Sequence, residues 1–396
     1  MKVLGIIAEY NPMHTGHIYH ISKAKKISGC DRVIVLMSGS FTQQGNISII
    51  NKFERARQAV ENGADLVIEI PAAFASSDAG NFAYKSVSIL NDLNIDTICF
   101  GAETDKIEKL NYISDILTSK DSEIWNDIKK QLKMGISFAN ARNKALNKFL
   151  GEKDIEILSC PNNILALEYL KSLKILNSNI TPFAIHRKSN FNSETLENCY
   201  TSSTSIRKSL ENNYNLQNIQ KYLPENVFEY LKSNKATFNN NFFEILKYKI
   251  ISMNESELKN INGISEGIEN KIKKEICDSY SYDDFIFKIK SKRYELSRIK
   301  RILINILLNI SKDNFKLLRE NKSNYAHILA FNHSKKDLLS YISNTSNIPI
   351  ISSLNSKKIS YLNKYQKLSL DIDIYASNIH SMLNKQKLNK DYTNFI

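Results

Sequence analysis

Cysteine, proline, glycine and long apolar runs are all scarce in this sequence of 396 residues. No apolar run is long enough to cross a bilayer and no cleavable signal pattern is present, so we expect a cytoplasmic protein with no membrane contact. The five cysteines lie far apart and form no CxxC pair, which argues against a structural zinc or a redox dithiol. We therefore predict buried free thiols and no resident metal site.

The net charge of +13 is unevenly distributed along the chain. Residues 1–100 hold nine basic and nine acidic residues, whereas the remaining residues hold 45 basic and 32 acidic ones. This asymmetry indicates a neutral chemical domain joined to a part that binds a polyanion. The same excess also follows from a C-terminal half rich in Lys, Asn, Ile and Ser, so charge alone leaves both interpretations open.

The first hundred residues alternate between short apolar runs and helical patterns. The apolar runs are continuous, which is typical of parallel strands covered on both faces, and this predicts a doubly wound, Rossmann-like α/β domain. We expect strands at Val3–Ala8, Arg32–Met37, Leu66–Ile70 and Thr97–Phe100, and helices at His17–Ser28, Lys52–Asn62 and Asp78–Leu93.

A second, mostly α-helical and basic domain is expected after residue 210, where Gly and Pro nearly vanish. We predict a catalytic domain over 1–210, with returning strands at Ile155–Leu158 and Ile180–Ile185, and a helical domain over 211–396. Residues 298–308 show one apolar and one basic helix face, a pattern that suits RNA binding or, less well, a membrane surface.

The motif HxGH follows the first predicted strand and opens the first predicted helix, as it does in nucleotidyltransferases. Gly16 lets a backbone approach phosphates, and a helix N-terminus offers free N–H groups to an anion. His14 and His17 can then bind the α- and β-phosphates during in-line attack, so we predict that both are catalytic. A metal site built from His14, His17, His20, Glu9 and Glu54 is the weaker alternative.

A Ser/Thr-rich segment, Thr201 to Ser205, precedes a predicted helix and is followed by Arg207 and Lys208. Hydroxyl groups and the helix N-terminus suit the β- and γ-phosphates, and Arg207 or Lys208 can neutralise the departing pyrophosphate. An ordinary helix cap with surface cations would show the same pattern. The nearby HxGH motif favours the catalytic interpretation, with Arg207 as the candidate residue.

Further segments, spread over nearly the full length, resemble one family. They are GIIAEYNPMHTGH at 5–17, MSGSFTQQG at 37–45, ENGADLVIEIP at 61–71, CFGAE at 99–103, PNNIL at 161–165, ITPFAIHR at 180–187 and SKRY at 291–294. With these segments the sequence resembles the tRNA(Met) cytidine acetate ligases.

That resemblance implies an enzyme that converts acetate and ATP to acetyl-adenylate and then acetylates N4 of the wobble cytidine of elongator tRNA(Met). It implies ATP as substrate, expected together with Mg²⁺, and no stable protein partner. The implied ATP-binding residues are Ile7, Ala8, Glu9, Tyr10, Asn11, Pro12, Met13, His14, Thr15, Gly16, His17, Ile18, Tyr19, His20, Gly101, Asn162 and Arg187.

The basic helical half supplies the expected tRNA contacts. Phosphate binding is predicted for a cluster of five cations, with Tyr294 among them as a stacking ring: Lys292, Arg293, Arg298, Lys300 and Arg301. One departure from the family is Gln44, where an Arg is common. The alternatives are a small-molecule adenylyltransferase of the pantetheine-phosphate or nicotinate-nucleotide type, and a non-catalytic RNA-binding protein.

Overall fold

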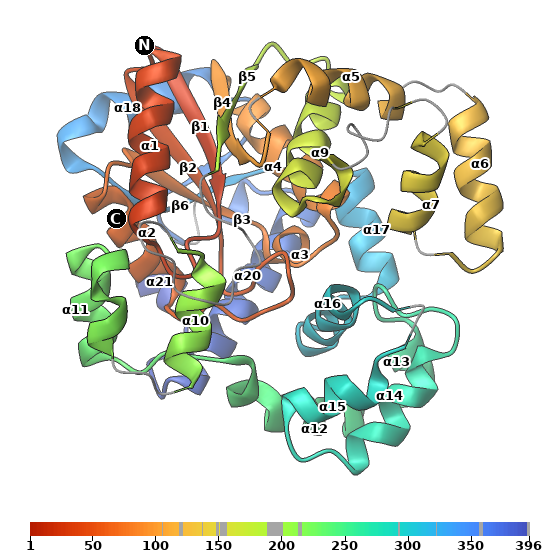
Figure 1. Ribbon diagram of the computed structural model, residues 1–396. Coiled ribbons are helices and arrows are strands. Elements are labelled where there is room, and N and C mark those ends of the chain that lie inside the picture. The colour runs from red at the N-terminus through yellow and green to blue at the C-terminus, as the bar shows by residue number, and fades with distance from the viewer. Residues whose placement is uncertain are drawn as a thin grey trace.

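The computed structural model describes residues 1–104, 106–118, 122–136, 138–147, 150, 157–187, 201–212, 216–291, 294–321, 323–355 and 359–393. A seven-stranded sheet runs through the molecule in the order β5-β4-β1-β2-β3-β6-β7 (Figure 1). Its strands are β1 (Val3–Ala8), β2 (Arg32–Ser38), β3 (Leu66–Ile70), β4 (Thr97–Ala102), β5 (Thr181–His186), β6 (Ala326–Phe331) and β7 (Ile350–Ile351). The five strands from β5 to β3 are parallel to one another, as expected for a doubly wound core.

Alternate residues of each parallel strand enter two different cores. In β2, Ile34 and Leu36 pack on one face of the sheet while Val33, Val35 and Met37 pack on the other. The second of these faces is covered by α1 (Thr15–Ser28), α2 (Lys52–Glu61), α10 (Ser203–Glu211), the 3₁₀ helix η2 (Leu216–Tyr222) and α11 (Glu225–Ser233). The opposite face is covered by α4 (Ala79–Asp92), α9 (Pro161–Ile175) and α18 (Lys336–Thr345). The helices α5 (Ile107–Thr118), α6 (Ser122–Lys133) and α7 (Phe138–Leu146) belong to the same core, and α5 packs on α9. Burial on both faces explains why the strand sequences are continuously apolar.

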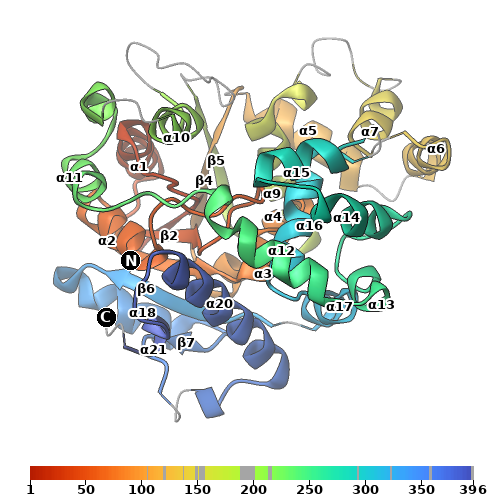
Figure 2. The ribbon, with the colours of Figure 1, turned by 90° about the horizontal axis from the view of Figure 1, so that it is seen from below.

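A separate helical core lies beside the sheet (Figures 1 and 2). It is built from η3 (Asn239–Phe242), α12 (Phe243–Ser252), α13 (Glu255–Lys259), α14 (Ile268–Cys277), α15 (Tyr282–Ile289), α16 (Leu296–Leu307) and α17 (Lys312–Glu320). Phe41, Ile47 and the short helix α3 (Ala72–Ala75) belong to the same core, so the helical part packs directly on the loops that follow β2 and β3. None of the described helices combines the length and apolar character that a membrane crossing requires.

One strand prediction was wrong, and two strands were not predicted. Ile157 and Leu158 belong to a 3₁₀ helix, η1 (Ile157–Ser159), and not to a strand, while Ile155 lies outside the described residues. The region after residue 210 contains two strands as well as helices, because β6 pairs antiparallel with β3 and β7 pairs with β6. The division at residue 210 stays a prediction, but part of the expected helical domain completes the sheet of the catalytic one.

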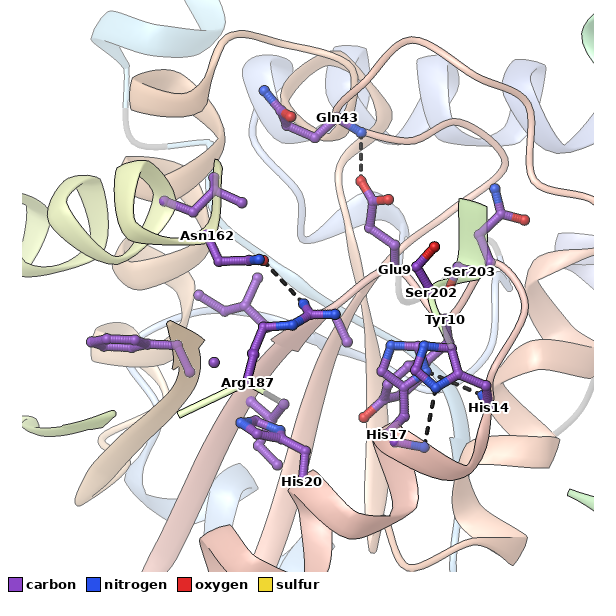
Figure 3. A pocket seen from close by; sticks show the side chains of 18 of the residues that line it. Glu9, Tyr10, His14, His17, His20, Gln43, Asn162, Arg187, Ser202 and Ser203 are labelled. Carbon is purple, nitrogen blue, oxygen red and sulfur yellow. Dashed lines mark hydrogen bonds between the residues drawn. The ribbon is translucent and has the colours of Figure 1, made fainter. Parts of the chain in front are cut away.

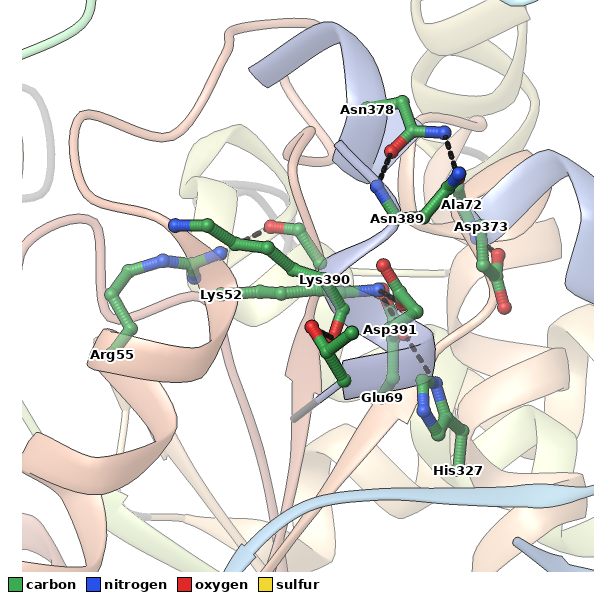
Figure 4. Close-up of polar contacts among 12 residues, drawn as sticks. Lys52, Arg55, Glu69, Ala72, His327, Asp373, Asn378, Asn389, Lys390 and Asp391 are labelled. Carbon is green, nitrogen blue, oxygen red and sulfur yellow. Dashed lines mark hydrogen bonds and ion pairs between the residues drawn. The ribbon is translucent and has the colours of Figure 1, made fainter. Parts of the chain in front are cut away.

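The C-terminal segment returns to the base of the sheet. It comprises the 3₁₀ helix η4 (His333–Lys335) before α18, and then α20 (Lys364–Leu383) and α21 (Lys390–Thr393). The buried Lys52 ammonium of α2 lies 2.8 Å from Glu69 Oε2 and 2.5 Å from Asp391 Oδ1, and His327 Nδ1 lies 2.8 Å from the same Glu69 oxygen (Figure 4). Glu69, His327 and Asp391 have the spacing of metal ligands, but the Lys52 ammonium already supplies the cation between the two carboxylates. We assign this cluster to anchoring α21.

Candidate active site

A pocket opens where β1, β4 and β5 end, which is the expected place for a ligand in a doubly wound sheet. Its lining comes from β1 and the turn after it, the first turn of α1, the loop after β2, and the starts of α9 and α10 (Figure 3). An apolar wall completes it, made of Ile6, Phe82, Phe100, Leu165, Tyr169 and Ile185. This wall was not predicted from the sequence, because its residues on α4 and α9 recur at the spacing of ordinary core positions.

His14 and His17 are held in one orientation by the N-terminus of α1. His14 is the N-cap of the helix, and its Nδ1 accepts the backbone N–H of Gly16 at 3.1 Å. The backbone N–H of His14 donates to His17 Nδ1 at 3.2 Å. The two rings stack with centroids 3.7 Å apart. Since both Nδ1 atoms accept hydrogen bonds, each neutral ring carries its proton on Nε2.

Burial keeps these imidazoles neutral. It lowers the pKa of His14 to about 3, with further lowering by the Arg187 and Arg207 guanidiniums. The pKa of His17 also lies well below its usual value of 6.5, mainly because of burial. The buried His14 Nε2 has no hydrogen-bond partner among the described residues. An unpaired buried donor costs about 1–3 kcal/mol, so this N–H is set to bind an acceptor on a ligand.

The predicted Ser-rich segment reaches the same pocket. Ser202 caps α10 by accepting the Ser205 N–H at 3.1 Å, and Ser203 Oγ donates to the Pro12 carbonyl at 3.1 Å. Arg207 donates from Nη1 to the Asn11 carbonyl at 2.6 Å and from Nη2 to Thr204 Oγ1 at 3.1 Å. The N-terminus of α10 and the Arg207 cation therefore lie against the HxGH turn. Lys208 is not among the described residues that line the pocket.

Gly101, Asn162 and Arg187 lie together on the other side of the pocket. Arg187 Nη1 donates to Asn162 Oδ1 at 3.0 Å (Figure 3). Asn162 Nδ2 donates in turn to Glu103 Oε1 at 2.6 Å. A Cβ atom on Gly101 would lie 3.0 Å from Arg187 Cγ. Gly101, one of the ATP-binding residues that the resemblance implies, therefore makes room for the arginine side chain.

Glu103 is a site residue that the sequence analysis did not single out. Besides holding Asn162, its carboxylate accepts the backbone N–H of Asn163 at 2.9 Å and so caps α9. Asn163 Oδ1 in turn accepts the Glu103 N–H at 2.9 Å, so the second asparagine of the pair has a structural role. Of the two, Asn162 is the one that lines the pocket.

The described cations of the predicted tRNA site are half-buried. Arg298 Nη2 donates to Ser265 Oγ at 2.9 Å, and its guanidinium lies 4.2 Å from the centre of the Tyr294 ring. Lys300 donates to Asn46 Oδ1 at 3.1 Å and Arg301 to the Gln43 carbonyl at 3.5 Å, which brings α16 to the loop at the edge of the pocket. Lys292 and Arg293 lie outside the described residues.

Two sequence interpretations are corrected at this site. Tyr294 is only 4% exposed within the helical core, so its ring is not free to stack on a base. In the metal alternative Glu54 does not join the imidazoles, because it accepts hydrogen bonds from Arg57 and Gln58 on α2 and does not line the pocket. Gln44, the departure from the family pattern, does line the pocket.

Comparisons with known proteins agree with this geometry. The family described as HIGH Nucleotidyl Transferase matches residues 1–394. A tRNA(Met) cytidine acetate ligase of Clostridium novyi (strain NT) is 39% identical over 393 residues, covering 97% of this chain and 96% of that protein. A protein of the same name from Clostridium perfringens is 40% identical over 404 residues, with 99% and 98% covered.

Two solved structures of Thermotoga maritima TmcAL share the fold, each at 30% sequence identity. The apo form has a TM-score of 0.92, covering 97% of this chain and 95% of that one. The form bound with alpha-thio ATP has a TM-score of 0.93, covering 100% and 98%. The likeness therefore extends over the catalytic sheet and the helical part together.

Proposed function

Since the chain belongs to the HIGH nucleotidyl transferase family and, within it, to the tRNA(Met) cytidine acetate ligases, we propose that it uses ATP to acetylate a cytidine of tRNA(Met). In this proposal the acceptor atom is N4 of the wobble cytidine of the elongator tRNA. The observation that carries it is the pair of neutral imidazoles at the start of α1, in a fold shared with a relative that binds an ATP analogue.

In the first step an acetate oxygen attacks the α-phosphorus of ATP, and the bond from that phosphorus to pyrophosphate breaks. The protein needs no nucleophile of its own, because positioning and charge stabilisation suffice for in-line transfer. The Nε2–H groups of His14 and His17 donate to phosphate oxygens as negative charge moves toward the pyrophosphate. Arg207 and the N-terminus of α10 hold the departing group, and Arg187 binds the nucleotide from the opposite side. The accompanying Mg²⁺ stays a prediction.

In the second step the cytidine N4 attacks the acetyl carbonyl carbon, the bond from that carbon to the AMP oxygen breaks, and N4 loses a proton. The five cations at 292–301 are proposed to hold the tRNA backbone. What supports this is the position of α16: Lys300 and Arg301 reach the loop at the edge of the pocket, so a phosphate bound on this helix lies near the site.

The length of the match favours this function over the alternatives. A pantetheine-phosphate or nicotinate-nucleotide adenylyltransferase needs no helical half, whereas the named ligases are matched over 97% or more of this chain. A relic RNA-binding protein would have no reason to keep His14, His17 and Arg207 aligned in one pocket.

Acetate labelled with ¹⁸O in both carboxyl oxygens tests the proposed mechanism. If acetyl-adenylate forms, one labelled oxygen bridges carbon and phosphorus and leaves with AMP after transfer. We expect one ¹⁸O atom in the AMP phosphate, detected by mass spectrometry. AMP without label, in a reaction that acetylates tRNA, would contradict the adenylate.

A further inference from the structure

Glu9 is an acidic side chain in a pocket built for a polyanion. It follows the last residue of β1 and is the one carboxylate among the described residues that line the pocket. A carboxylate beside a triphosphate is unfavourable, since like charges repel, and the first half-reaction gives it no task. Its place in this pocket therefore points to a ligand group that donates hydrogen bonds.

The Glu9 carboxylate is held in a defined orientation. Its Oε1 accepts the backbone N–H of Gln43 at 2.8 Å (Figure 3). Gln43 is fixed in turn, because its side chain donates to the Ser77 carbonyl at 3.2 Å and its carbonyl accepts from Arg301 at 3.5 Å. Oε2 makes no hydrogen bond to any residue that the structure describes, so one oxygen is anchored while the other can accept from a ligand.

The surroundings of Glu9 suit proton transfer. Burial raises the pKa of Glu9 above its usual 4.5, while the Gln43 N–H and the Arg207 and Arg55 guanidiniums lower it again in part. Burial raises the pKa of the Tyr169 phenol on α9, and the charge of Glu9 adds to this rise. A carboxylate whose pKa is shifted toward neutral pH is a better proton acceptor than an ordinary surface carboxylate.

The imidazoles and guanidiniums of the pocket are less suited to accept a proton, and burial lowers the pKa of His20 on α1 to about 4. Both Nδ1 atoms of His14 and His17 are used by backbone N–H groups, and their Nε2 atoms carry the proton. Arg187 and Arg207 are donors only. His186, at the end of β5, is exposed and lies at the rim.

We propose that Glu9 is the general base of the acetyl-transfer step, with Oε2 accepting a proton from the exocyclic amino group of the acceptor base. This rests on the proposed function. The amino nitrogen attacks the acetyl carbonyl carbon, the new C–N bond forms, and the C–O bond to AMP breaks with its electron pair going to the AMP phosphate. The proton lost by the nitrogen goes to Glu9 and then to solvent. The carboxylates of aspartate and glutamate suit this amino group because they accept hydrogen bonds from cytosine N4.

The test compares the two half-reactions in the full-length enzyme with ATP, acetate and a tRNA(Met) transcript. Glu9→Gln keeps an oxygen for the Gln43 N–H but cannot take a proton. We expect it to lower single-turnover transfer from preformed acetyl-adenylate by about 10²–10⁴-fold. Acetate-dependent exchange of pyrophosphate into ATP should fall far less. Glu61→Gln, which removes an exposed carboxylate on α2, is the matched control.

A pH profile separates a base from a positioning residue. In the wild-type enzyme the transfer rate should fall as pH drops through the pKa of Glu9, and in Glu9→Gln this dependence should vanish. Equal losses in both half-reactions, or a wild-type transfer rate that does not fall toward acid pH, would overturn the proposal. The wild-type profile decides the matter even if the variant does not fold. Wild-type exchange that needs no acetate would instead refute the proposed function.

Discussion

At the scale of single residues, His14 both caps α1 and offers an N–H to a ligand, because its two ring nitrogens have different partners. Nδ1 caps α1 through the Gly16 N–H, while Nε2 is buried without a partner among the described residues. An asparagine could keep the first role, since it is a good N-cap, but has no donor at the Nε2 position. The two roles can therefore be separated by substitution.

We predict that His14→Asn folds normally but lowers acetate-dependent pyrophosphate exchange by about 10²–10³-fold, the usual loss for one transition-state donor. His14→Ala should show the same loss of exchange and also a lower free energy of unfolding, by about 1 kcal/mol, from the missing cap. Exchange by a folded His14→Asn variant at the wild-type rate would remove this imidazole from the mechanism.

His380 provides a pH test of burial away from the pocket. It is 3% exposed on α20, its Nε2 lies 2.9 Å from the Ser48 carbonyl, and burial lowers its pKa to about 4. Between pH 6.5 and 4 the unfolded chain therefore binds a proton at this position that the folded chain does not. Its contribution to stability is present above pH 6.5 and is lost as pH falls through that window.

Between pH 7 and pH 5 the contribution of His380 to the free energy of unfolding falls by about 2 kcal/mol, at 1.36 kcal/mol per pKa unit. His380→Gln retains a donor for the Ser48 carbonyl and does not titrate. Urea unfolding at both pH values should show that the wild type loses about 2 kcal/mol more than the variant over this range. Identical losses would show that His380 is protonated in the folded state.

How well sequence predicted the site depended on the kind of residue. His14, His17, Asn162, Arg187 and Arg207 were identified from motifs or resemblance, and the structure brings them into one pocket. Such residues can be recognised in motifs because the reaction requires particular residue types at a particular spacing in the sequence. The apolar wall was missed because a side chain that faces a ligand has the same composition as one that faces the core. Glu103 was not recognised because its role depends on a contact between β4 and α9.

At the scale of elements, the strands with continuous apolar runs were predicted to within one or two residues. β6 was missed because Ala326–Phe331 lies in a helix-rich region without flanking Gly or Pro, and only its pairing with β3 identifies it as a strand. α16 was predicted with one apolar face, and Ile299, Ile302 and Ile306 are indeed buried. Its cations were predicted to bind tRNA phosphates, and two of them, Lys300 and Arg301, also contact the loop after β2 because the helix docks there.

Gly45 lies in the loop after β2, at the point where α16 packs on that loop. Its φ is +76°, and a Cβ atom there would lie 2.6 Å from the Arg301 backbone nitrogen. We predict that Gly45→Ala lowers the free energy of unfolding by about 1–3 kcal/mol more than Gly29→Ala does. Gly29 is the matched control, because its φ is +62° but nothing lies within 4 Å of the added carbon. Equal losses in thermal unfolding would show that α16 is not packed this closely on the loop.

At the scale of the whole molecule, a neutral catalytic sheet is joined to a basic helical part. We predict that replacing Lys292 and Arg293 together by Ala weakens tRNA binding and lowers its salt slope by roughly two, one for each lost phosphate contact. Acetate-dependent pyrophosphate exchange measures the ATP site alone, so it should change little. Replacing Lys25 and Lys26, exposed cations on α1, is the control for net charge. A salt slope equal to that of the control variant would place the RNA elsewhere.

The central claim is that this pocket uses ATP to place an acetyl group on a tRNA cytidine. The most direct measurement incubates the protein with ATP, deuterated acetate and a tRNA(Met) transcript, digests the RNA and analyses its nucleosides by mass spectrometry. We predict one N4-acetylcytidine per tRNA carrying the deuterated acetyl group, dependent on ATP and strongly reduced in His14→Asn. Adenylylated small molecules or unmodified nucleosides from the active, folded protein would contradict it.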